Sequence, residues 1–100
     1  MTDTMPSLDS GALFPLGDMV ATPAALDALS RVGIAPDQLL ARHVRGDWGD
    51  LDAHDRQMND LALSAGERLL SSFSLPDATD IWIITEADRS ATTLLLPGDY

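Results

Sequence analysis

The spacing of apolar residues changes about two-thirds of the way along this 100-residue chain, and that change limits the folds available to it. Between about residues 22 and 66 the apolar residues recur every three or four positions, which is typical of amphipathic helices. From about residue 69 they form short runs, rich in β-branched residues and separated by turn-forming residues, which is typical of strands. Helices followed by a block of strands predict an α+β domain.

Each predicted helix has its own start and stop signals. Thr22 is a good N-cap and Pro23 suits the first helical turn, where its missing N–H costs nothing. Asp52 is the N-cap of the last helix, and Gly33 and Gly66 suit the left-handed position that ends a helix. The helices are expected at residues 23–32, 36–45 and 53–65.

The predicted strands lie at residues 69–75, 81–85 and 91–96, joined by two short turn clusters that indicate an antiparallel meander. A further strand is available at residues 18–21, where Pro15 limits it to an edge. We therefore predict three short helices packed on one face of a three-stranded antiparallel sheet, four-stranded if residues 18–21 join it. Alternation along the second strand directs Trp82 away from the helices. Residues 1–12 are predicted to be a disordered arm, and residues 13–100 a single domain.

Charge and composition exclude several classes of function. The chain has 16 acidic and 6 basic side chains, a net charge of −10 and no cysteine. A chain this acidic repels phosphates, which argues against direct binding of nucleic acid. The lack of cysteine excludes disulfides and cysteine-based zinc sites and favours the cytoplasm. No apolar run approaches the ~18 residues of a membrane span, and no basic signal region is present. We expect no membrane association and no cofactor.

The densest polar segment, residues 43–55, contains four aspartates and two histidines. Carboxylates can replace phosphates as partners of arginine and lysine, so a row of them can imitate a nucleic-acid strand. The same aspartates also suit helix caps and turns. Trp48 is either a buried lid over the small core or an exposed anchor for a partner. The candidate binding residues are Asp47, Trp48, Asp50, Asp52 and Asp55.

An enzymatic alternative uses part of the same segment. His43, Asp47 and Asp50 are residue types that bind divalent metals, and a metal-dependent hydrolase is the corresponding activity. Their spacing matches no established metal-binding motif, so we assign no catalytic and no metal-ligating residue. The second polar cluster, residues 85–90, is predicted to be a turn in which Asp88 accepts backbone hydrogen bonds.

Several blocks of this sequence resemble a family of small bacterial proteins that is common on plasmids and integrated mobile elements. The blocks are Leu13-Phe14-Pro15-Leu16-Gly17, Val20-Ala21-Thr22-Pro23, and residues 42–50, 81–90 and 92–97. The resemblance covers about residues 13–100. It implies an accessory protein that travels with mobile DNA, and it supplies no active-site residue.

These observations favour a small acidic interaction protein over an enzyme. A mobile element must survive host defences, and an acidic protein can occupy the basic nucleic-acid-binding surface of a defence nuclease complex. We therefore predict an inhibitor of the anti-CRISPR or anti-restriction class that acts as a DNA mimic. The competing interpretation is an acidic housekeeping protein whose charge only maintains solubility.

Overall fold

Local capping signals set the helix boundaries in the computed structural model, which describes residues 11–100. Thr22 Oγ1 accepts the Ala25 N–H at 3.1 Å, and Gly33 ends the same helix at φ 71°. Asp52 accepts the Asp55 N–H at 2.8 Å. The elements, in order, are β1 (Asp18–Ala21), α2 (Pro23–Val32), α3 (Pro36–Val44), α4 (Ala53–Ala65), β2 (Leu69–Ser74), β3 (Asp80–Thr85), β4 (Ala91–Leu95) and the 3₁₀ turn η1 (Pro97–Asp99). The predicted helices and strands are thus confirmed.

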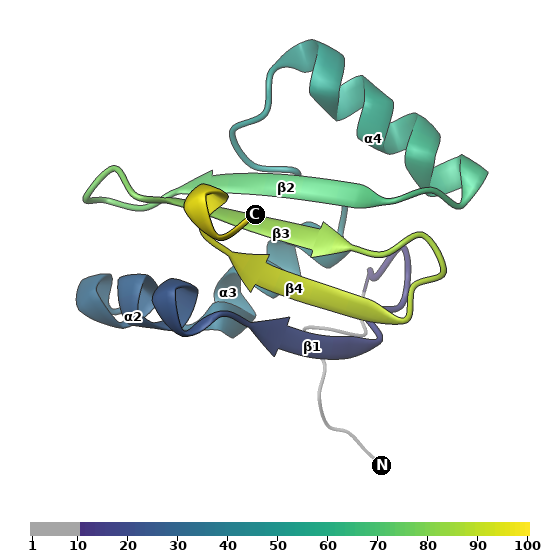
Figure 1. The fold of residues 1–100 in the computed structure, drawn as a ribbon. Coiled ribbons are helices and arrows are strands. Elements are labelled where there is room, and N and C mark those ends of the chain that lie inside the picture. Colours follow the sequence, from purple (N-terminus) through teal and green to yellow (C-terminus); the bar gives the residue numbers. More distant parts are fainter. Residues whose placement is uncertain (1–10) are drawn as a thin grey trace.

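The four strands form one sheet in the order β1-β4-β3-β2 (Figure 1). β2, β3 and β4 make the predicted antiparallel meander. β1 pairs with β4 in parallel, so the prediction of a purely antiparallel sheet is wrong. The helical crossover returns the chain so that β2 runs in the same direction as β1. Two hairpin reversals then give β4 that direction again, and β1 and β4 meet as parallel neighbours.

The two faces of the sheet differ. The core lies on the face covered by α2 and α3, where Leu29 and Leu40 pack with the strand residues Phe73, Ile83 and Leu94. Figure 1 views the other face, which no α-helix of the described residues covers and in front of which the 3₁₀ turn η1 lies; it also shows α4 running alongside β2 at the edge of the sheet. Trp82 is half-buried on this open face, as its alternation predicts. Residues 1–10 of the predicted arm lie outside the described residues.

Candidate functional site

The loop between α3 and α4 carries the predicted acidic segment and lies along the outer edge of β2. The Asp50 N–H donates to the Ser72 carbonyl at 2.7 Å, and the Ser72 N–H donates to the Trp48 carbonyl at 3.1 Å. Gly49 lies between them at φ 78°, where a β-carbon would overlap the β2 backbone. Only glycine allows this close approach. The loop therefore has a fixed position on the sheet edge.

Hydrogen bonds hold the first two predicted carboxylates in place. Asp47 accepts Arg42 Nε at 2.7 Å and the Gly49 N–H at 3.0 Å. These two bonds lower the pKa of Asp47 below its usual value, and the bond from Arg42 has the larger effect. Asp50 Oδ2 accepts the Ser74 N–H at 2.7 Å and so ties the loop to the end of β2.

The other two predicted carboxylates lie at the start of α4. Asp52 is the N-cap of this helix, and Asp55 is in its first turn, where a negative charge interacts favourably with the helix dipole. All four predicted carboxylate residues are exposed: Asp47, Asp50, Asp52 and Asp55. The structure thus places them on one exposed segment, and Asp52 also has the capping role that its sequence position suggests.

Trp48 is a lid over the core, because only 2% of its surface is exposed. Its ring stacks on Phe14 with centroids 6.2 Å apart and meets His43 edge-on at 5.6 Å. Its indole N–H donates to Asp60 Oδ1 at 3.0 Å, which satisfies the one polar atom of the side chain. Of the two interpretations of Trp48, the structure supports the lid and not the exposed anchor.

His43 is fully buried, and both of its ring nitrogens have hydroxyl partners. Nδ1 lies 2.5 Å from Ser71 Oγ, and Nε2 lies 2.9 Å from Thr85 Oγ1. Thr85 in turn contacts Thr92 at 2.8 Å, and Thr92 donates to the Leu16 carbonyl at 2.7 Å. Burial, with a smaller effect from the positive charge of Arg89, lowers the pKa of His43 to about 4. The ring is therefore neutral at physiological pH.

This burial removes the basis of the hydrolase alternative. His43 cannot ligate a metal together with Asp47 and Asp50, because its nitrogens are engaged in the core and those carboxylates lie on the exposed loop. Within residues 11–100, no group of three or more histidine, cysteine, aspartate or glutamate side chains is arranged to hold a metal ion.

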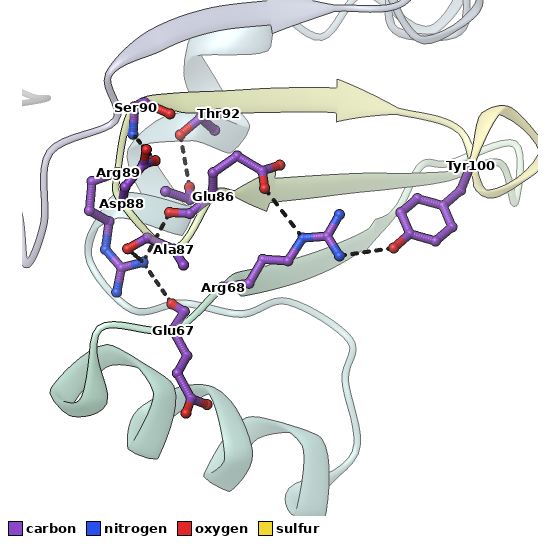
Figure 2. A network of polar contacts seen from close by, with 10 residues as sticks. Glu67, Arg68, Glu86, Ala87, Asp88, Arg89, Ser90, Thr92 and Tyr100 are labelled. Carbon is purple, nitrogen blue, oxygen red and sulfur yellow. Dashed lines mark hydrogen bonds and ion pairs between the residues drawn. The ribbon is translucent and has the colours of Figure 1, made fainter.

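Of the predicted turn at residues 85–90, Thr85 is the last residue of β3 and residues 86–90 form the turn between β3 and β4, shown in Figure 2. A bond from the Ser90 hydroxyl lowers the pKa of Asp88 below its usual value, and the Ser90 N–H, which donates to Asp88 Oδ1 at 2.9 Å, lowers it further. Arg89 adopts φ 61° and donates from Nη1 to the Glu67 carbonyl at 2.6 Å and to the Glu86 carbonyl at 3.1 Å. The guanidinium thus joins the hairpin turn to Glu67, two residues beyond the end of α4.

Sequence reasoning missed a hollow of about 210 Å³ on the open face of the sheet. Tyr100 and Trp82 meet there edge-on with centroids 5.9 Å apart. Figure 2 shows Arg68 donating to the Tyr100 hydroxyl, at 3.0 Å. Arg68 Nε also lies 3.7 Å from a Glu86 carboxylate oxygen. The alternation of Trp82 was the available signal, but its partners come from distant positions. The lining residues are Arg68, Leu69, Leu70, Trp82, Ile84 and Tyr100.

No family model matches the chain, and no curated protein or solved structure matches it. None of the helices within residues 11–100 has the length and apolar character needed to cross a membrane.

Proposed function

We propose that this protein is a small acidic, non-enzymatic interaction protein of the cytoplasm. In this proposal, the carboxylates of residues 47–55 bind the basic nucleic-acid-binding surface of a host defence nuclease complex, of the CRISPR or restriction type. The resemblance to proteins of plasmids and mobile elements supports this choice of partner. The protein itself is not proposed to bind nucleic acid, a membrane, a metal or a cofactor.

The fixed position of exposed carboxylates is the observation that carries the proposal. Asp50 and Asp52 each accept a backbone N–H through one oxygen, at 2.7 and 2.8 Å respectively. A carboxylate has about four acceptor sites on two oxygens, so each group keeps capacity for an arginine or lysine. Because the loop is already held against β2, little conformational entropy is lost when a partner binds. Net charge −10 adds long-range attraction to a basic surface.

The test is inhibition of DNA cleavage by a purified restriction complex and by a purified crRNA-guided complex. We expect inhibition that competes with DNA and weakens steeply when salt rises from about 50 to about 200 mM. Asp47→Asn plus Asp50→Asn should abolish it. Asparagine retains an acceptor oxygen for the same backbone N–H groups, so the loop is expected to stay folded.

A control pair with the same change of charge is Asp27→Asn plus Asp77→Asn. Asp27 pairs with Arg31 on α2, and Asp77 accepts the Thr79 N–H at 3.1 Å in the β2–β3 turn, so both carboxylates lie outside residues 47–55. The control pair should leave inhibition nearly intact. An equal loss in both pairs, salt-independent inhibition, or no inhibition of either complex would contradict the proposal.

A further inference from the structure

We propose that β1 binds an extended, positively charged segment of a partner protein, which joins the sheet as an additional strand. This surface is distinct from the carboxylates of residues 47–55, because β1 and β2 are the opposite end strands of the sheet. The proposal goes beyond the function proposed above and does not depend on it.

The edge at β2 is closed by specific contacts. The Asn59 side chain accepts the Leu70 N–H at 3.1 Å and donates to the Leu70 carbonyl. Trp48 and Asp50 bond the next outward-facing residue, Ser72, through their backbone atoms. An edge protected in this way offers few free backbone groups to another chain.

The edge at β1 has no such cover among residues 11–100. The Asp18 N–H bonds the Ser90 carbonyl at 2.9 Å, and the Thr22 N–H bonds the Leu94 carbonyl at 3.0 Å, so these residues face β4. Backbone groups alternate in direction along a parallel strand, so Met19 and Ala21 direct their N–H and carbonyl groups away from the sheet. These groups can form the hydrogen bonds of an added strand.

The side chains beside this edge are apolar and exposed. Met19 is 55% exposed and Val20 is 51% exposed, and they point to opposite faces of the sheet. On the helix side, a groove of about 180 Å³ lies between β1 and α3. An added strand would place alternate side chains against this groove and against Val20. The groove is lined by Met19, Val20, Ala21, Pro36, Asp37, Leu40 and Leu94.

Charge selects a basic segment as the occupant. Asp37 lines the groove, Asp18 is exposed at the start of the strand, and neither the strand nor the groove lining includes an arginine. A second copy of this chain would bring together two molecules of net charge −10, which repel each other. A lysine- or arginine-bearing strand is attracted instead, and its flanking cations can lie beside the two carboxylates.

The test measures amide hydrogen exchange of Met19 and Ala21 in the full chain, with a capped heptapeptide of alternating lysine and valine as the probe. We expect fast exchange in the free protein at all concentrations, and at least about tenfold slower exchange with the peptide. A glutamate–valine peptide, or the lysine–valine peptide with N-methylated backbone nitrogens facing β1, should give no protection.

Two protein variants form a matched pair. Met19→Lys places a cation at the edge and should weaken binding of the lysine–valine peptide about tenfold or more. Met58→Lys adds the same charge at a side chain that is 51% exposed on α4, and binding should change by less than about threefold.

Each other outcome overturns the proposal. Protection of Met19 and Ala21 in the dilute free protein would mean that the chain covers its own edge. Protection that rises with protein concentration would mean that a second copy is the occupant. Three results would show that β1 is not a site for a basic strand. They are equal binding of the glutamate–valine or N-methylated peptide, no protection at millimolar lysine–valine peptide, and equal effects of the two variants. Because residues 47–55 are unchanged throughout, these failures are separate from failure of the inhibition assay.

Discussion

The buried state of His43 predicts that the protein loses stability in mildly acidic solution. The pKa of this ring is about 4 in the folded protein and 6.5 in the unfolded chain. Below about pH 6.5 the unfolded chain therefore binds a proton that the folded protein does not bind, and the free energy of unfolding falls as the pH falls. At about 1.4 kcal/mol per pH unit, the loss is about 2 kcal/mol by pH 5 and about 3 kcal/mol at pH 4 and below.

This window is separate from that of the aspartates. The pKa of Asp47 is lowered by its hydrogen bonds, so its stabilising effect is present above the usual aspartate pKa of 3.8 and is lost only as the pH falls further. Between about pH 6.5 and 5 the slope should thus come mainly from His43. Urea unfolding followed by tryptophan fluorescence at several pH values measures it.

Variants of the two histidines provide the control for this measurement. His54 is exposed, so His54→Gln should keep the slope, whereas His43→Gln should lose most of it and unfold at lower urea concentration. If His43→Gln does not fold, the ring resonances of His43 in the natural chain give the same answer by NMR, since they should not titrate above about pH 5. Titration near pH 6.5, or an equal slope in the two variants, would refute the argument.

Two further predictions concern the edge at β2. Asn59→Ala leaves the backbone groups of Leu70 without their side-chain partner, and in urea titrations it should reduce the free energy of unfolding by about 1–3 kcal/mol. The control is Gln57→Ala, at an exposed position on the same helix, which should change the free energy of unfolding by less than about 0.5 kcal/mol. Gly49→Ala combines left-handed backbone strain with overlap against the β2 backbone, and it should lower the free energy of unfolding by about 3 kcal/mol or more. Gly66 has φ 71° with open space around it, so Gly66→Ala should lower the free energy of unfolding by only about 1 kcal/mol. Equal thermal unfolding shifts for the two glycine variants would contradict the close approach of the loop to β2.

The elements were predictable because their signals are local. Thr22 and Asp52 cap the helices that follow them, and alternation placed Trp82 on the open face. The parallel pairing of β1 with β4 was not predictable, because it depends on where a long crossover ends. The role of Asn59 was also hidden, since its partner Leu70 lies 11 residues away and no motif links them. At the acidic segment, the sequence indicated both the cap at Asp52 and the exposed row, and the structure contains both features.

The buried hydroxyl groups could not be predicted from the sequence pattern. Ser71, Thr85 and Thr92 occupy the core face of the sheet, where alternation alone favours apolar residues. Each is tolerated there because it is hydrogen-bonded within the network that includes His43. A polar residue on a core face is explained only by its partner, and the partner comes from another strand or helix.

Residues from distant parts of the sequence gather around His43. Phe14 packs edge-on to its ring at 5.3 Å, Trp48 covers it, and Arg89 lies 5.7 Å from the Phe14 ring. Thr92 completes the polar network. Residues in such positions fix the packing of one buried cluster, so they concern the fold more directly than an activity. Binding is to be tested at the exposed carboxylates of residues 47–55 and at the open edge of β1. At both places, groups able to bind a partner face outward.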